Sequence, residues 1–132
     1  GFNCTVFAYG QSGAGKSFSV VGYGPNIGII PRAVKEIFSI VESNEDAAVR
    51  FEVEIAMIEI YMDKVYDLLI PRKSKREELK VFINRGEVFI YNPKDRSNRD
   101  IIYRACKDAE QAEAFRKQGD ENRTVRPTGM NP

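Results

Sequence analysis

The feature that most constrains the fold is a glycine-rich segment close to the start of the sequence. Its residues are Gly10-Gln11-Ser12-Gly13-Ala14-Gly15-Lys16-Ser17, which fit the phosphate-loop pattern G-x-x-x-x-G-K-S. The apolar residues 6–9 predict a short β-strand before this loop, and residues 16–21 predict the first turns of a helix after it. A strand, a loop and a helix in that order are the context in which such a loop binds phosphates. The sequence therefore predicts a phosphate-binding loop between a strand and a helix.

The residue types of the phosphate loop (residues 10–17) suit a bound nucleoside triphosphate with magnesium. Glycines allow the backbone to curl so that successive N–H groups point inward, and the following helix presents the positive end of its dipole. In this pattern Lys16 reaches the β- and γ-phosphates, and the hydroxyl of Ser17 is a ligand of Mg²⁺. Phe18 follows, either as a core aromatic or as a ring that faces an adenine base. The predicted nucleotide-binding residues are Gly10, Gln11, Ser12, Gly13, Ala14, Gly15, Lys16, Ser17 and Phe18.

Composition excludes several other kinds of site. A chain of 132 residues suits one domain or part of one. Its net charge of +1 gives no overall electrostatic field that would attract nucleic acid. The sequence has no histidine, which excludes histidine catalysis and histidine metal ligands in these residues. Cys4 and Cys106 lie far apart, so we expect buried thiols of a reducing compartment. No apolar run is as long as a membrane span and no signal peptide is found, which favours a cytoplasmic protein.

Two further helices are predicted. Pro31 suits the first position of one helix, and residues 43–46 would end it. Asp108 is predicted to cap the other, with Gln111 as its capping-box partner and Gly119 as its end. The apolar faces of the two helices would carry Val34, Ile37, Phe38 and Val41 in the first and Ala109, Ala112 and Phe115 in the second.

The middle of the chain has the patterns of strands. Residues 51–61 predict a long strand, half exposed at first and buried on both faces later. A short turn or helix is expected at residues 65–69, followed by a charged loop at 71–78. Residues 79–83 and 88–91 predict a hairpin around Asn84-Arg85-Gly86-Glu87. Of the carboxylates here, Glu59 would end a strand, whereas Asp63 and Asp67 are expected to be solvated and not catalytic.

The sequence resembles the kinesin motor domain at four places in the right order. The matching segments are Phe7-Ala8-Tyr9 with the phosphate loop, Gly28-Ile29-Ile30-Pro31-Arg32, Ile58-Glu59-Ile60-Tyr61 with Val65-Tyr66-Asp67-Leu68-Leu69, and Asn122-Arg123 with Thr128 and Met130-Asn131. The Ala-Tyr-Gly-Gln lead into the loop is absent from other phosphate-loop families. The resemblance covers nearly the whole chain, and it predicts that residues 1–132 are part of one motor domain, from the nucleotide loop through the helix that precedes the first switch loop.

The resemblance implies a fold and an activity. The fold would be α/β: the three-layer P-loop NTPase fold, with a mainly parallel central sheet, helices on both faces and a small antiparallel hairpin lobe. The activity of the complete domain would be microtubule-stimulated hydrolysis of ATP, coupled to movement. ATP with Mg²⁺ would be the ligand, tubulin the partner and the cytoskeleton the location. Nucleic acid and membrane insertion are not expected.

The family also has elements that these residues do not contain. The Ser-Ser-Arg-Ser-His switch loop expected after Pro132 is absent, and so is the later switch that senses the γ-phosphate. The sequence starts inside the apolar run of residues 1–9 and stops at Asn131-Pro132 in the middle of a polar stretch. We therefore expect a slice of a larger domain. The catalytic residues are therefore unknown, and we expect residues 1–132 alone to lack efficient turnover.

Two questions are left open by the sequence. The basic residues Arg72, Lys73, Lys75, Arg76 and Arg85 lie in or near the hairpin lobe, which in the family touches the acidic surface of tubulin; they would either bind tubulin or form a solvated charged loop. The second question concerns function. The alternatives to a motor ATPase are a motor-like module that docks on microtubules without hydrolysis, and another P-loop ATPase.

Overall fold

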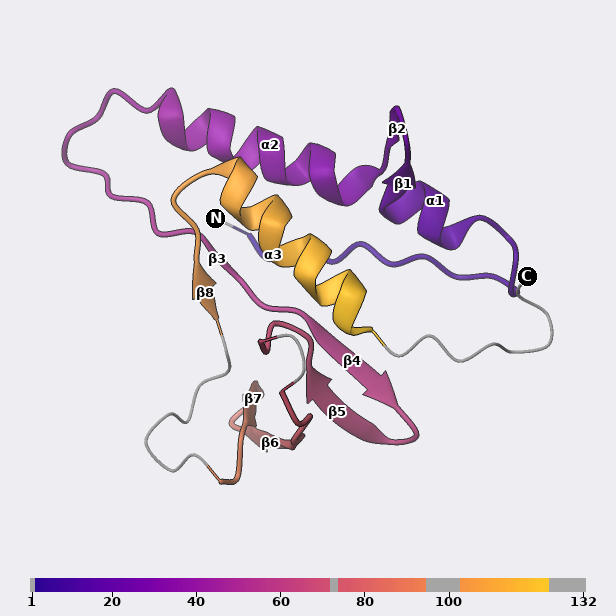
Figure 1. Cartoon of the computed structure of the whole chain (residues 1–132). Helices are drawn as coiled ribbons and strands as arrows, with labels where there is room; N and C mark the ends of the chain where they lie inside the picture. Colours follow the sequence, from indigo (N-terminus) through magenta and orange to yellow (C-terminus); the bar gives the residue numbers. More distant parts are fainter. Residues whose placement is uncertain (1, 72–73, 95–102, 124–132) are drawn as a thin grey trace. The chain divides into compact units, whose positions relative to one another are not determined.

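The computed structural model describes residues 2–71, 74–94 and 103–123, which form two units (Figure 1). Residues 2–45 belong to the first unit and residues 46–123 to the second. The elements of the first unit are α1 (Lys16–Val20), β1 (Gly22–Tyr23), β2 (Asn26–Ile27) and α2 (Ile29–Glu42). Those of the second are β3 (Glu54–Ile55), β4 (Ile58–Tyr61), β5 (Lys64–Asp67), β6 (Glu78–Asn84), β7 (Glu87–Tyr91), β8 (Arg104–Ala105) and α3 (Ala109–Asn122).

The strand predicted at residues 6–9 is not formed. These residues have no regular secondary structure, and Phe7 and Tyr9 are 83% and 95% exposed. A β-strand needs a neighbour for its backbone N–H and C=O groups. No described segment pairs with residues 6–9, which explains why an apolar sequence alone does not produce a strand here. Cys4, in the same segment, is exposed and not buried as predicted.

The first unit otherwise follows the predicted order. Helix α1 begins at Lys16 as expected, and the glycine-rich connector after it forms the small antiparallel hairpin β1–β2. Helix α2 begins two residues earlier than predicted, with Gly28 as its N-cap. Pro31 is tolerated at the third position because the N–H groups of the first turn have no acceptor within the helix. Phe38 is buried, but Ile37 is 46% exposed, since it lies at the edge of the predicted apolar face.

The second unit contains two small sheets in place of the predicted long strand. Residues 51–61 are divided at Ala56–Met57 into β3, which pairs with β8, and β4, which pairs with β5. At the break the backbone N–H of Leu68 donates to the carbonyl of Met57 at 2.9 Å. The exposed fraction of β4 alternates along the strand, so β4 is not buried on both faces. Residues 65–69 were predicted as a turn or helix, but Lys64–Asp67 form β5.

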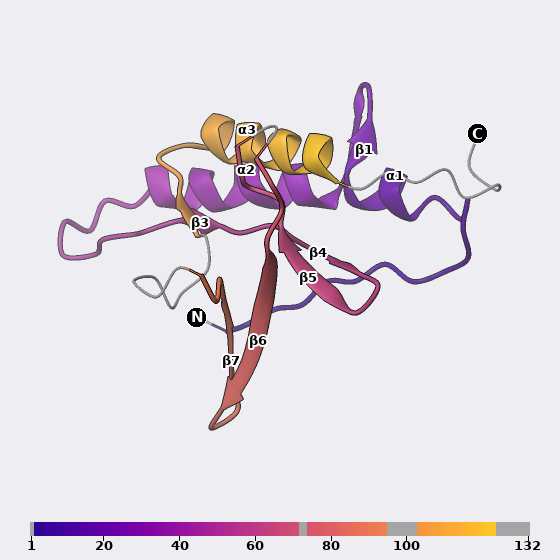
Figure 2. The same cartoon turned by 60° about the horizontal axis from the view of Figure 1, so that its bottom comes forward.

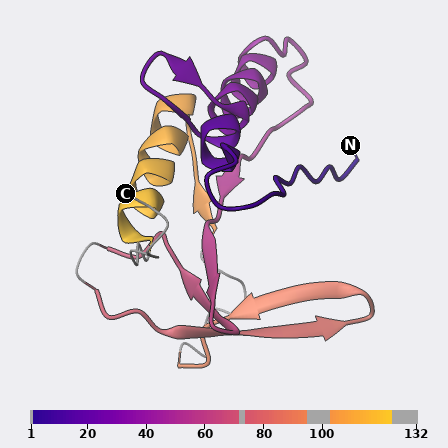
Figure 3. The ribbon, with the colours of Figure 1, turned by 90° about the vertical axis from the view of Figure 1, so that its right-hand side faces the viewer.

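Strands β4, β5, β6 and β7 form one antiparallel sheet in that order. The predicted hairpin is confirmed: Asn84 pairs with Glu87, and Arg85 and Gly86 form a turn with φ angles of 51° and 85°. Figures 2 and 3 show this hairpin running out from β4 and β5 as a long ribbon. Every strand pair among the described residues is antiparallel, so the parallel central sheet stays a prediction.

Asp108 caps helix α3 as the sequence predicts, but the side chain of Gln111 bonds to the residue before the cap and not to Asp108, as a capping box would. The carboxylate of Asp108 accepts from the N–H of Gln111 at 2.7 Å, and the Gln111 side chain accepts from the N–H of Lys107 at 2.9 Å. Gly119 does not end the helix, which continues to Asn122. A Cβ atom at this buried glycine would lie 2.2 Å from the sulfur of Met57. The absence of a side chain at Gly119 thus allows Met57 to approach the helix this closely.

Side chains of α3 also hold the segment that follows β5 (residues 68–70). Leu68 and Leu69 are each 2% exposed, and their carbonyl groups lie in the interior of the second unit. The amide of Gln118 donates to the carbonyl of Ile70 at 2.8 Å, and that of Asn122 donates to the carbonyls of Leu68 and Ile70 at 2.9 Å each. These contacts satisfy backbone acceptors that no strand pairs. No helix in the described part of the chain is long and apolar enough to cross a membrane.

Candidate nucleotide-binding site

Three glycines give the phosphate loop its shape. Gly10, Gly13 and Gly15 have φ angles of 149°, 80° and 82°, a region that side chains with a Cβ atom rarely adopt. A tight turn inside the loop is closed by the N–H of Ala14, which donates to the carbonyl of Gln11 at 3.2 Å. Gly15 then starts α1, because its carbonyl accepts from the N–H of Ser19 at 2.9 Å. The loop and the helix start are thus one continuous structure, as the sequence predicts.

The ammonium group of Lys16 contacts the first two residues of the phosphate loop. Its Nζ atom donates to the carbonyl of Gly10 at 2.7 Å and to that of Gln11 at 2.6 Å. A lysine ammonium has three N–H donors, so one remains for a ligand. The neighbouring Ser17 is exposed, which leaves its hydroxyl accessible to a hard cation. The structure therefore brings the charged side chain, the hydroxyl and the glycine backbone together in a small exposed region.

Phe18 is not a core residue, which was one of the two interpretations that the sequence allowed. It is 49% exposed and stacks on Tyr23, with ring centroids 6.4 Å apart and an angle of 25° between the planes. Tyr23 lies on β1 and was not predicted as a site residue. Its only sequence signal is an aromatic residue inside a glycine-rich connector, seven residues after Lys16.

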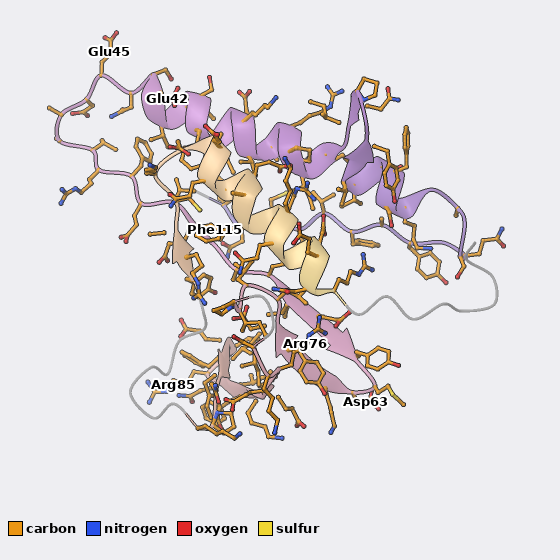
Figure 4. The ribbon with its side chains drawn as sticks, in the orientation of Figure 1. Glu42, Glu45, Asp63, Arg76, Arg85 and Phe115 are labelled. Carbon is orange, nitrogen blue, oxygen red and sulfur yellow. The ribbon has the colours of Figure 1, made fainter. Side chains whose placement is uncertain are left out.

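The predicted basic surface is only partly available. Arg76 forms an ion pair with Glu59 at 2.8 Å, and both side chains are largely covered. Lys75 and Arg85 are exposed, and Figure 4 shows Arg85 well apart from Arg76. Arg72 and Lys73 lie outside the described residues. The structure thus leaves Lys75 and Arg85 as the exposed candidates for an acidic partner.

Asp67 is buried, contrary to the prediction of a solvated residue. Its side chain is 5% exposed, and its Oδ1 atom accepts from the N–H of Leu69 at 2.8 Å. Arg104 lies 3.8 Å from Oδ2, which has no hydrogen-bond partner among the described residues. Burial raises the pKa of Asp67, and the Leu69 N–H and the charge of Arg104 partly oppose that rise. These contacts give Asp67 a structural role at the end of β5.

A hollow of about 400 Å³ lies along β4, lined by Glu59, Tyr61, Leu68 and Arg123 among others. It contains no residue of the phosphate loop. No group of three or more Cys, Asp or Glu side chains in the described ranges is placed to hold a metal ion. Burial raises the pKa of Cys106, which does not favour its reactive thiolate form.

The sequence and the structure match known proteins over nearly the whole chain. Residues 1–132 match the family described as Kinesin motor domain. Kinesin-related protein 1 of Dictyostelium discoideum is 37% identical over 99% of this chain and 6% of its own length, and human Kinesin-like protein KIF13A is 36% identical over 99% and 7%. The chain thus spans less than a tenth of these two relatives.

Solved structures of kinesins share the fold. One is a KIF14 dimer in the two-heads-bound state, with AMP-PNP and in complex with a microtubule; it has a TM-score of 0.77 and 24% identity, over 93% of this chain and 32% of that chain. Another, KIF14 with ADP in complex with a microtubule, has a TM-score of 0.75 and 23% identity over 93% and 33%. At these identities the likeness concerns the fold. Taken with the match of the whole sequence, it confirms the predicted resemblance, and the chain belongs to the kinesin motor domain family.

Proposed function

We propose that this chain is the ATP-binding part of a microtubule-based motor, in which ATP hydrolysis is coupled to movement along microtubules. The observation that carries the proposal is the phosphate loop, closed by the two contacts of Lys16 with the carbonyls of Gly10 and Gln11. An exposed glycine-rich loop with one cation beside it suits a triphosphate better than any uncharged ligand. The nucleotides named for the KIF14 structures, AMP-PNP and ADP, support the same class of ligand.

In this proposal the residues have separate roles. The glycines of residues 10–15 supply backbone donors, Lys16 contacts the β- and γ-phosphates with its remaining donor, and Ser17 supplies an oxygen to Mg²⁺. The exposed hydroxyl of Ser17 fits that metal, which prefers oxygen ligands and keeps several waters. Bound Mg²⁺ would neutralise charge that develops on the phosphate oxygens. The protein would act on the cytoskeleton, with microtubules as its partner.

The direct test is phosphate release with and without microtubules. We expect the full-length natural protein to release phosphate from ATP faster when microtubules are added, and the polypeptide of residues 1–132 to show little turnover. Microtubule binding without phosphate release would instead support a docking module that has lost hydrolysis. Phosphate release that microtubules leave unchanged would indicate another kind of P-loop ATPase. Equal stimulated rates for the two polypeptides would contradict our view that the catalytic residues lie outside this chain.

The basic residues give a second test. We expect alanine at Lys75 and Arg85 to weaken co-sedimentation of the full-length protein with microtubules by roughly two- to tenfold at low salt, since exposed ion pairs are each worth little. The effect should shrink as salt is added, because exposed charges are screened. Arg72 and Lys73 can be added to the variant. Arg76 is best kept, because its loss would leave Glu59 without this partner.

A matched control removes the same charge elsewhere. Lys35 and Lys107 are exposed and lie outside the hairpin and its neighbouring loop, so a Lys35→Ala, Lys107→Ala variant has the same net charge as the test variant. If both variants lose the same affinity at low salt, only net charge matters. If neither loses any, Lys75 and Arg85 belong to a solvated surface.

A further inference from the structure

The two rings of Phe18 and Tyr23 form an aromatic surface directly after the phosphate loop. Their planes are 25° apart with centroids at 6.4 Å, a stacked arrangement, and the residues are 49% and 65% exposed. Phe18 is two residues from Lys16 on α1, and Tyr23 is on β1, whose hairpin rises from the end of α1 (Figure 1). Exposed aromatic rings cost solvation free energy, and two stacked ones beside a phosphate site suggest a ligand with a flat ring.

The hairpin holds Tyr23 in one position relative to α1. Strands β1 and β2 pair Gly22 with Ile27 and Tyr23 with Asn26. A Cβ atom at Gly22 would lie 2.1 Å from the carbonyl oxygen of Asn26, and one at Gly28 would lie 2.5 Å from the carbonyl of Val20 at the end of α1. The N–H of Gly28 also donates to the carbonyl of Val21 at 3.0 Å. Such close backbone contacts leave the short hairpin little freedom to move away from the helix.

We propose that Tyr23 is a positioning residue for the nucleobase of the bound nucleotide. The inference rests on the proposed binding of a nucleoside triphosphate at the phosphate loop. Tyr23 stacks on one face of Phe18. It thereby fixes the Phe18 ring against which the base lies, or adds a second ring to the surface that the base contacts. Binding of the base at this site involves no covalent bond and no additional cofactor.

This arrangement recognises the base by its face and not by its edges. Stacking on aromatic rings is tolerant of base identity, because every base has a π-face. The platform should therefore stabilise adenine and guanine nucleotides alike, and it should contribute nothing to a ligand without a base. Tripolyphosphate with Mg²⁺ has the same anionic chain and no base, which makes it the probe that separates the two parts of the site.

The test compares dissociation constants in the full-length natural protein. We expect Tyr23→Ala to weaken the binding of ATP by about two- to tenfold, which is the range of free energy of one aromatic pair. The binding of GTP should be weakened by the same factor to within about twofold. Tripolyphosphate should bind Tyr23→Ala as it binds the wild type, and Tyr23→Phe should bind ATP normally because it keeps the ring. Tyr103→Ala is the matched control, since that tyrosine is 55% exposed and lies in the other unit.

Two further outcomes separate this inference from the proposed function. Lys16→Ala should weaken the binding of both ATP and tripolyphosphate. If it weakens the binding of neither, the nucleotide site itself is misplaced. If Lys16→Ala has its expected effect and Tyr23→Ala leaves ATP unchanged, the loop binds nucleotide but Tyr23 does not position the base. Loss of tripolyphosphate binding in Tyr23→Ala would also overturn the inference, because it would show a general effect on the loop. Gly22→Ala, which must disturb the hairpin, should weaken ATP in the same direction as Tyr23→Ala.

Discussion

Replacing Lys16 by alanine is expected to lower the affinity of the full-length protein for ATP by about ten- to more than a hundredfold, the effect of losing a charge-assisted contact. The structure adds a second cause. The same ammonium joins the carbonyls of Gly10 and Gln11, so its removal frees a loop whose glycines have little conformational preference of their own. Titration with a fluorescent ATP analogue measures the loss directly.

Two controls make this result specific. Lys16→Met keeps the length of the side chain without its charge, so it should bind ATP as poorly as Lys16→Ala. Lys35→Ala removes an exposed lysine from α2 and should leave the affinity unchanged. Equal affinities for the wild type and Lys16→Ala would contradict the assignment of the phosphate loop.

The second large effect is expected at Leu68. Leu68→Ala should lower the free energy of unfolding by about 2–5 kcal/mol, because it removes apolar contacts and leaves a cavity. Leu68 is 2% exposed and lies in the segment that Asn122 holds by its carbonyl. Denaturation of the full-length protein by urea, followed by circular dichroism, measures the change.

Ile83→Ala is the matched control for that experiment. Ile83 is 67% exposed near the turn of the β6–β7 hairpin, so removing a similar amount of side chain there should cost no more than about 0.5 kcal/mol. Comparable losses for the two variants would mean that Leu68 is not a core residue of the folded protein. The comparison therefore tests where the interior of the second unit lies.

Features fixed by neighbouring residues were predicted from the sequence. The phosphate loop, the start of α1, the turn at Arg85-Gly86 and the Asp108 cap each depend on side chains or φ angles within a few residues. Glycine at a left-handed position and aspartate before a helix have direct local causes. These causes act in any context, which is why the sequence pattern was sufficient.

Features that depend on distant residues were missed. Residues 6–9 are apolar but form no strand, because a strand needs a partner that the sequence pattern cannot supply. The strand pattern at 51–61 gave no sign of its break, which occurs where the chain changes pairing partner from β8 to β5. Gly119 was predicted to end a helix, but the approach of Met57 explains it instead.

The candidate site shows the same division. The loop residues follow from their motif, whereas the stack of Tyr23 on Phe18 depends on the hairpin between them. The pairing of Arg76 with Glu59 joins residues 17 apart in sequence, so a run of basic residues gave no means to tell Arg76 from Lys75. Long-range pairing thus decides which of several similar charges is exposed.

The contacts between α3 and residues 68–70 have a consequence for synthesis of the chain. Gln118 and Asn122 follow the carbonyls they hold by 48 to 54 residues. At about 5–20 residues per second, the ribosome needs roughly 3–10 s to make that stretch. During this interval Leu68 and Leu69 have been synthesised, but the amide groups that satisfy the carbonyls of residues 68–70 do not yet exist. The end of β5 is thus a part of the nascent second unit whose native contacts form late, and its structure is completed only when the last turn of α3 has been made.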